Sequence, residues 1–335
     1  MIKNPYRATS HPITEDSIPF PSVNAKAPLR LLSRCPDYQV TPMVQMVFDG
    51  SEAEYFIKDE RTRMGLGSFK ALGAAYVIAH EAQSRDVSST TFVTASAGNH
   101  GLSVAAGAKV FGARAVVYLS NTVPEGFAQR LRELGADVRR SGEDYEQSMQ
   151  AALEAADENG WYLLSDSSWE GYIEPPHRLM EGYTVLAAEC VDQMTQPPTH
   201  IFLQAGVGGL AAASAAYFRE KWGQDVQIIV VEPDAAPALY ASIDEGAFVA
   251  TKGPVSNMGR LDCKEASLIA LKGLARDADR FVLISDQDAS DGVRRLDELG
   301  LSTSESGGAG LIAALLDIIP LEPNDRVLCI LSEGA

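Results

Sequence analysis

From residue 91 to residue 164 the sequence alternates between short apolar runs and longer helical ones. The short runs predict strands at 91–95, 115–119, 136–139 and 161–164. The longer runs predict helices at 101–111, 124–134 and 144–158. Strands that alternate with helices of ~10–15 residues are typical of βαβ units, which form a parallel sheet. We therefore expect residues 89–168 to form a small α/β domain.

The same alternation surrounds this block. Upstream it predicts strands at 41–47 and 55–59 and a helix at 69–82. Downstream it predicts strands at 200–203, 226–232, 280–284 and 326–331 and helices at 177–194, 210–222, 235–245, 266–275, 286–300 and 308–319. Residues 1–40, rich in Pro, Ser and Thr, are expected to form an extended arm over the surface or a partner subunit. The fold class is thus α/β, with two parallel-sheet domains; the smaller is inserted into a larger one made of residues 1–88 and 169–335.

The charge balance excludes some partners. The chain of 335 residues carries 28 basic and 45 acidic side chains, a net charge of −17. Nucleic acid and anionic membranes both require a basic surface, so neither is expected as a partner. The four cysteines form no closely spaced pair, no run of ~20 apolar residues occurs, and the N-terminus lacks an apolar signal core. We expect a cytoplasmic protein without a metal site.

The stretch 67–73 places one lysine, Lys70, among small and apolar residues at the start of a predicted helix. Burial among apolar groups lowers the pKa of a lysine, and a neutral amine can attack an aldehyde to form a Schiff base. Many lysines at helix starts are simply solvated. The chemical interpretation therefore depends on other stretches of the chain.

The stretch 96–101, Ser-Ala-Gly-Asn-His-Gly, lies between a predicted strand and a predicted helix. Its small residues allow backbone N–H groups to approach an anion at the helix N-terminus. The amide of Asn99 can hydrogen-bond a ring oxygen. An ordinary strand-to-helix turn, with His100 buried beside it, is the competing interpretation.

The stretch 204–210, Gln-Ala-Gly-Val-Gly-Gly-Leu, has the same position and more glycine. Exposed N–H groups and a helix dipole make it a phosphate-binding loop. Gly206, Gly208 and Ala211 also match the dinucleotide fingerprint, with Glu232 ending the next strand. A dinucleotide-dependent oxidoreductase therefore stays open as an alternative, although it gives Lys70 and Asn99 no role.

The last predicted strand ends at Leu331, and Ser332 follows it. Open α/β sheets bind ligands at the carboxyl ends of their strands, where a serine hydroxyl can donate to a pyridine nitrogen without protonating it. A chain terminus is the plain alternative. Because the sequence stops so soon after this strand, we expect further residues beyond Ala335.

In order and spacing these stretches resemble the fold-type II pyridoxal-phosphate enzymes, the group of tryptophan synthase β-subunits and threonine dehydratases. The diaminopropionate ammonia-lyases are the most similar family within it. The resemblance extends over most of the chain and includes, besides the stretches above, residues 36–42, 63–66, 169–172, 231–234, 261–265 and 305–307. The tryptophan stretch at 169–172 is the most specific of these.

The resemblance implies pyridoxal 5'-phosphate as the cofactor and assigns roles to individual residues. Lys70 would be the Schiff-base lysine and α-proton base, and Asp166 a second catalytic carboxylate. The cofactor would be held by Lys70, Asn99, Gly206, Val207, Gly208, Gly209 and Ser332. The substrate would contact Ser96, Ala97, Gly98 and His100. A homodimer is also implied.

Two regions depart from the resemblance, the asparagine loop and the segment 258–265. Ala97 stands where the family's lyases that act on both enantiomers carry an aspartate that would deprotonate the D-isomer, so activity on D-isomers stays open. Arg260 and Lys264 stand where the family has small residues, and either would favour a substrate with an extra negative group if it faced the pocket. The competing interpretation is that both side chains are solvated.

The implied reaction is β-elimination from a β-substituted L-amino acid such as 2,3-diaminopropionate, giving a 2-oxo acid and ammonia. The alternative within the same cofactor class is a dehydratase acting on 3-hydroxyaspartate, threonine or serine.

Overall fold

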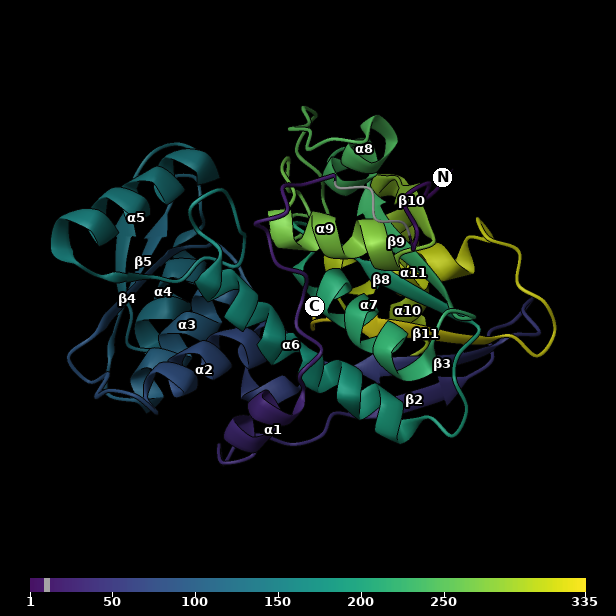
Figure 1. The fold of residues 1–335 in the computed structure, drawn as a ribbon, viewed down its shortest axis with the longest axis horizontal. Coiled ribbons are helices and arrows are strands. Elements are labelled where there is room, and N and C mark those ends of the chain that lie inside the picture. Colours follow the sequence, from purple (N-terminus) through teal and green to yellow (C-terminus); the bar gives the residue numbers. More distant parts are fainter. Residues whose placement is uncertain (9–12) are drawn as a thin grey trace.

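Two β-sheets organise the protein (Figure 1). The computed structural model describes residues 1–8 and 13–335. One sheet has seven strands in the order β1 (Ile2–Lys3), β10 (Arg280–Ile284), β9 (Gln227–Pro233), β8 (His200–Gln204), β11 (Arg326–Leu331), β3 (Glu54–Asp59) and β2 (Met43–Met46). The other has four, in the order β6 (Asp137–Arg140), β5 (Arg114–Leu119), β4 (Thr91–Ala95) and β7 (Tyr162–Leu163).

The seven-stranded sheet is parallel through its centre and antiparallel at its edges. Strand β11 pairs in parallel with β3 and β8, while β1 and β2 run antiparallel to their neighbours. Side chains alternate between the faces, as the period of two requires. Val230 packs in the core on one face, with helices α6 (Glu174–Gln193), α7 (Gly209–Trp222), α8 (Ala238–Glu245) and α9 (Leu268–Asp277). Val231 packs on the other, with α10 (Asp286–Glu298) and α11 (Glu305–Leu315).

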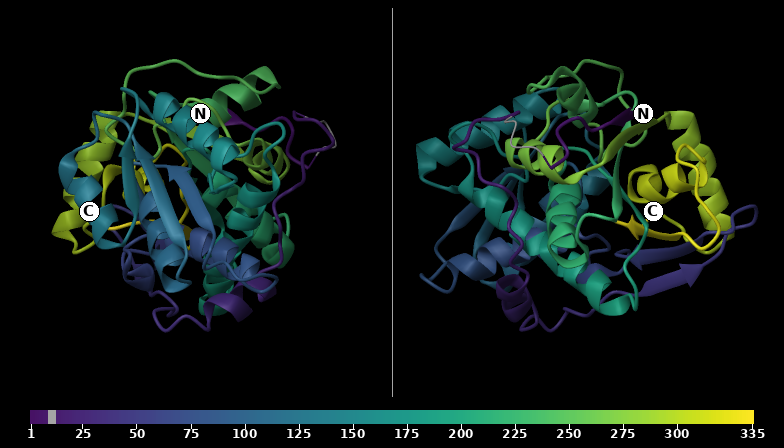
Figure 2. Two further views of the ribbon diagram at one scale, coloured as in Figure 1. Left: turned by 90° about the vertical axis from the view of Figure 1, so that its left-hand side faces the viewer. Right: turned by 45° about the vertical axis from the view of Figure 1, so that its right-hand side comes forward.

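The four-stranded sheet is parallel throughout and is also covered on both faces. Helix α5 (Tyr145–Asn159) packs on one face through Ala152 and Ala155. Helices α3 (Asn99–Val110) and α4 (Glu125–Glu133) pack on the other, where Leu102 and Leu131 join the larger core. Figure 2 shows this sheet from its own side of the molecule.

Helix α2 (Lys70–Glu81) lies between the two sheets and touches helices from both sides. A Cβ at Gly73 would stand 2.7 Å from Cε1 of Tyr183 on α6, and one at Gly107 on α3 would stand 2.9 Å from Cδ1 of Ile78. Glycine is therefore required where these helices meet. The domain boundaries at 88/89 and 168/169 stay a prediction; all four strands of the smaller sheet fall between them.

Most predicted elements are present, and the strands at 91–95, 280–284 and 326–331 have the predicted bounds. The predicted start of α6 at His177 is wrong, because Pro175 and Pro176 fit the first helical turn. The predicted start of α11 at Gly308 is also wrong, because Ser304 caps the helix by accepting from Gly307 N at 2.9 Å.

The prediction of an extended arm over residues 1–40 is only partly right. The segment contains β1 and a short helix, α1 (Lys26–Leu32), and residues 9–12 lie outside the described ranges. A 3₁₀ turn (Arg63–Gly65) precedes α2. No helix within the described residues is long and apolar enough to cross a membrane.

Candidate active site

The segments singled out in the sequence converge at the carboxyl ends of strands from both sheets, the edge at which open α/β sheets bind ligands. The backbone brings two of them together directly. Phe69 N donates to Ser332 O at 3.1 Å, and Ser68 and Glu333 form an isolated β-bridge. The chain end after β11 therefore holds the residues that lead into Lys70.

Lys70 and Asp166 form an ion pair, with Nζ 2.5 Å from Oδ2. Burial is the largest single influence and lowers the pKa of Lys70, but the charge of Asp166, its hydrogen bond and the nearby Tyr183 together outweigh burial, so the pKa is raised. The expectation of a neutral Lys70 amine is thus wrong for the cofactor-free protein, because the sequence does not reveal which carboxylate faces it. Burial raises the pKa of Asp166, but Lys70 and His100 more than offset this, so the pKa is lowered and Asp166 stays ionised.

The asparagine loop is held by its own side chains. Ser96 Oγ accepts from Gly98 N at 3.2 Å and from Gly101 N at 3.1 Å. Asn99 begins α3, and its Nδ2 donates to Glu333 Oε2 at 2.5 Å. Ala97 is exposed at the tip of the loop. The structure thus brings Asn99 to the chain end, whereas the Ser96 hydroxyl is occupied within its own loop.

His100 is buried, with its Nε2 2.8 Å from Leu164 O. Burial lowers the pKa of the ring, although the charge of Asp166 opposes this. Its Nδ1 is buried and has no partner among the described residues. The buried ring is close enough to Lys70 and Asp166 for both charges to act on it.

The glycine loop leaves backbone groups uncovered at the start of α7. No side chain caps this helix, and Gly208 has φ +95°. A Cβ at Gly206 would stand 3.0 Å from the sulfur of Cys263, and one at Gly208 would stand 2.9 Å from Cβ of Ala270. Val207 O accepts from the backbone of residue 267 at 3.0 Å. These contacts fix a glycine loop without a capping side chain at the N-terminus of a helix, which suits a phosphate.

Glu333 is a site residue that sequence reasoning missed. It is 4% exposed, and its carboxylate accepts from Asn99, from Arg260 at 2.5 Å and from the Ser304 hydroxyl. The preceding Ser332 is 5% exposed and makes no side-chain hydrogen bond to another described residue. The sequence does contain a signal for Glu333, because this acidic residue follows closely after a predicted strand whose carboxyl end lies at the ligand-binding edge.

Arg260 and Lys264 are the two basic residues that differ from the family pattern, and only Arg260 lies at this site. It pairs with Glu333 and lies 3.8 Å, at its Cγ, from the Cβ position of Gly98. Lys264 is held elsewhere, with Nζ 2.5 Å from Asp262 Oδ1 and 2.9 Å from Ala235 O. Of the two, Arg260 is the one that can meet a substrate.

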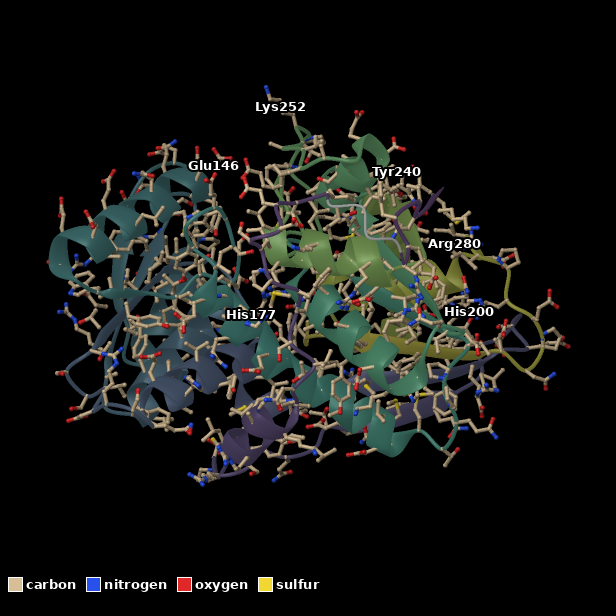
Figure 3. All side chains as sticks on the ribbon, in the orientation of Figure 1. Glu146, His177, His200, Tyr240, Lys252 and Arg280 are labelled. Atoms are coloured by element: carbon tan, nitrogen blue, oxygen red, sulfur yellow. The ribbon has the colours of Figure 1, made fainter. Side chains whose placement is uncertain are left out.

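Sequence reasoning also did not identify two tyrosines near the Lys70–Asp166 pair. Tyr183 on α6 has its ring centroid 5.8 Å from Lys70 Nζ. Tyr145 begins α5 and is 53% exposed, yet surrounding protein and the charge of Asp166 raise the pKa of its hydroxyl. Figure 3 labels its neighbour Glu146 at the end of α5 that points toward α8 and α9. Neither tyrosine belongs to a local motif.

The dinucleotide alternative fails at Glu232. This residue is fully buried, and its two oxygens accept from Leu239 N at 2.8 Å and Tyr240 N at 2.7 Å. Burial raises its pKa to about 8, with the two backbone hydrogen bonds opposing the shift. A carboxylate that is engaged by the first turn of α8 cannot reach a ribose.

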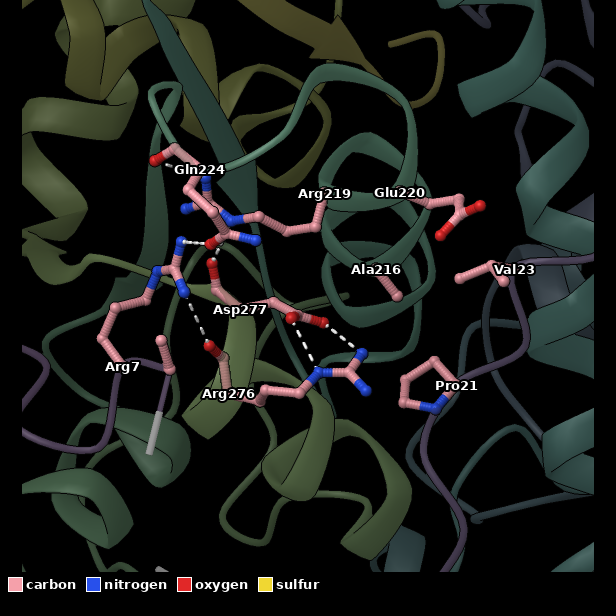
Figure 4. A pocket seen from close by; sticks show the side chains of 10 residues that line it. Arg7, Pro21, Val23, Ala216, Arg219, Glu220, Gln224, Arg276 and Asp277 are labelled. Atoms are coloured by element: carbon pink, nitrogen blue, oxygen red, sulfur yellow. Dashed lines mark hydrogen bonds and ion pairs between the residues drawn. The ribbon is translucent and has the colours of Figure 1, made fainter. Parts of the chain in front are cut away.

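A cavity of about 600 Å³ lies apart from this site, lined by Arg7, Pro21, Arg219, Arg276 and Asp277 among others (Figure 4). Its cations are already paired. Arg276 bonds Asp277 at 2.7 Å, and Arg7 and Arg219 both bond Asp279. We find no chemistry for this cavity in the described residues that line it.

Comparisons with known proteins agree with the geometry. The family model "Pyridoxal-phosphate dependent enzyme" matches residues 35–333. The diaminopropionate ammonia-lyase of Escherichia coli (strain K12) is 33% identical, over 83% of this chain and 79% of that protein. The Salmonella typhimurium (strain LT2) enzyme of the same name is 32% identical over 90% and 86%. The L-threonine ammonia-lyase of Geobacter sulfurreducens is 27% identical over 80% and 64%.

The fold matches as well. A crystal structure of the Escherichia coli diaminopropionate ammonia lyase, in complex with an aminoacrylate-PLP azomethine reaction intermediate, superposes with a TM-score of 0.87. It is 29% identical and covers 99% of this chain and 93% of that one. The chain belongs to the fold-type II pyridoxal-phosphate-dependent enzymes. Its uncapped glycine loop, Lys70 at the start of α2, and a Ser332 hydroxyl that bonds no other described residue fit that cofactor.

Proposed function

We propose that the protein is an ammonia-lyase that carries out β-elimination on a β-substituted L-amino acid, with 2,3-diaminopropionate as the preferred substrate. One observation supports this most strongly. Asp166, which stays ionised and is 20% exposed, lies beside Lys70 at the ligand-binding edge. A carboxylate there attracts the distal ammonium group of the diamine.

Bound pyridoxal phosphate supplies an aldehyde for Lys70 and an electron-accepting ring that stabilises negative charge at the substrate's α-carbon. The chain's own residues hold it. The N–H groups at the start of α7 bind the phosphate, Asn99 donates to the ring oxygen, and Ser332 donates to the ring nitrogen. Because a hydroxyl is a weak acid, Ser332 leaves that nitrogen neutral.

Lys70 is the group that moves the α-proton once its amine is free and neutral. Asp166 then has two tasks, since it holds the Lys70 nitrogen in place and attracts the distal ammonium group that leaves as ammonia. One ammonia leaves from the β-carbon. Free 2-aminoacrylate hydrolyses in water to a 2-oxo acid and a second ammonia. Ala97 offers no second base on the opposite side, so the reaction is limited to L-isomers.

Arg260 favours a second candidate, a 3-hydroxyaspartate dehydratase. Its guanidinium lies beside the asparagine loop, and its side chain is 40% exposed. A substrate with a β-carboxylate could replace Glu333 as the partner of Arg260 through a bidentate contact. The diamine, with its positive end, could not.

The test is an absorbance spectrum of the purified protein, followed by separate additions of L-2,3-diaminopropionate, D-2,3-diaminopropionate, L-threo-3-hydroxyaspartate and L-threonine. We expect an absorbance band of bound pyridoxal phosphate, and ammonia release from the L-diamine alone. Release from hydroxyaspartate alone would replace the first candidate by the second. No turnover of any β-substituted amino acid by cofactor-loaded protein would contradict both.

A further inference from the structure

Tyr183 has a buried hydroxyl that the fold does not use. The residue is 1% exposed, and its hydroxyl oxygen has no hydrogen-bond partner among the described residues. An unpaired polar group in a protein interior costs free energy, so each such group in a native structure requires an explanation. A partner that is absent from the protein chain itself would provide one.

The ring of Tyr183 is fixed in position by three neighbours. It packs edge-on against Phe69, with centroids 4.9 Å apart, and its Cε1 lies 2.7 Å from the Cβ position of Gly73. On the other side its Cε2 lies 3.7 Å from the Cβ position of Gly209. Packed in this way, the ring cannot turn its hydroxyl toward another acceptor.

The position of the hydroxyl points to its partner. Gly209 is the first residue of α7, where no side chain caps the free N–H groups. Lys70 Nζ lies 5.8 Å from the Tyr183 ring centroid, close enough for its charge to act on the hydroxyl. Burial raises the pKa of the hydroxyl and outweighs the opposing charge of Lys70, so the hydroxyl keeps its proton and can donate. A donor beside a helix N-terminus suits an anion.

We infer that Tyr183 is a further cofactor-binding residue, whose hydroxyl donates a hydrogen bond to the phosphate of bound pyridoxal phosphate. The inference rests on the cofactor and on its placement under "Proposed function", but not on which amino acid is the substrate. It makes the glycine loop one side of the phosphate site and α6 the other.

Tyr76 provides a matched control. It lies on α2, close to α6, and is fully buried, but its hydroxyl donates to Glu181 Oε2 at 2.8 Å. Tyr183→Phe removes a hydroxyl without a partner in the fold, whereas Tyr76→Phe removes one that has a partner. The two substitutions change the same atom in similar surroundings.

The experiment compares cofactor-free wild type, Tyr183→Phe and Tyr76→Phe. Each protein is melted thermally and titrated with pyridoxal phosphate and with pyridoxal, which lacks the phosphate, in the absence of amino acids. We expect Tyr183→Phe to weaken pyridoxal phosphate binding about tenfold or more, because one charge-assisted hydrogen bond is lost. Its pyridoxal affinity and melting temperature should not fall. Tyr76→Phe should lower the melting temperature by about 2 °C and leave both affinities unchanged.

Three results would overturn the inference. One is unchanged pyridoxal phosphate affinity in Tyr183→Phe. Another is an equal loss for both ligands, which would assign the hydroxyl to the ring or to Lys70. The third is a loss of melting temperature as large as that of Tyr76→Phe, which would reveal a partner within the protein. The titrations contain no substrate, so a wild type that binds the cofactor but releases no ammonia would contradict the proposed function alone.

Discussion

Among the charged side chains that the structure describes, two groups invite comparison because each contains a lysine paired with a carboxylate. The first, the buried charge cluster, consists of Lys58, Glu60, Arg63 and Glu189. The second is the Lys70–Asp166 pair. The side chains of Lys58 and Glu189 are 0% and 3% exposed, whereas those of Lys70 and Asp166 are 21% and 20% exposed.

The two groups also differ in how completely their polar atoms are used. In the cluster, two cations balance two carboxylates. Lys58 Nζ additionally donates to Thr41 O and Gln193 Oε1, and Arg63 bonds both carboxylates. Around Lys70, the Tyr183 hydroxyl and His100 Nδ1 are buried without partners in the described chain. A structural charge cluster is complete in the folded chain, whereas a site for chemistry retains groups that await a ligand.

Replacing each lysine by methionine tests this difference most directly. Lys70→Met should abolish the absorbance of bound cofactor and reduce turnover by roughly 10⁴-fold or more, because the base and the attachment point are both lost. Stability of the cofactor-free protein should fall less than in Lys58→Met, since these side chains are about one-fifth exposed and water can reach Asp166. Turnover at the wild-type rate would contradict the assignment of Lys70.

Lys58→Met should have the opposite effects, a large loss of stability and unchanged turnover. Glu189 and Thr41 O would lose a buried partner, which we expect to cost about 3–5 kcal/mol of unfolding free energy in urea. Turnover per folded molecule should match that of the wild type, because no atom of the cluster belongs to the site. The contrast between the groups would collapse if Lys58→Met were as stable as Lys70→Met.

Asp166→Asn tests the pairing through pH. The pKa of Lys70 is raised by Asp166, so near neutral pH almost all of the amine is protonated and cannot attack an aldehyde. The rate of pyridoxal phosphate loading by the wild type should therefore rise about tenfold for each pH unit. Removing the carboxylate leaves burial to lower the pKa, and the profile should move to lower pH, with faster loading at pH 7. A variant whose profile coincides with that of the wild type would show that Asp166 does not control Lys70.

The same contrast explains what the sequence could reveal. Lys70, the asparagine loop and the glycine loop are local patterns at strand-to-helix junctions, so their type and order were predicted. The contacts that define the site join distant residues. Lys70 and Asp166 are 96 positions apart, and Asn99 and Glu333 are 234 apart. Tyr183 lies on the apolar face of the long helix α6, and the sequence around it does not show that its hydroxyl would lack a partner.

The Arg260–Glu333 pair combines features of the two groups. Glu333 is buried like the carboxylates of the charge cluster, whereas the side chain of Arg260 is 40% exposed. Arg260→Ala should change stability by less than about 1 kcal/mol, because the pair is partly solvated. If Arg260 meets a β-carboxylate, the variant should raise KM for L-threo-3-hydroxyaspartate about tenfold and leave KM for L-2,3-diaminopropionate unchanged. Lys264→Ala, which removes a cation held by Asp262, is the matched control and should change neither KM. Equal KM changes for both substrates would instead assign Arg260 to positioning Glu333, and thereby Asn99, rather than to substrate selection.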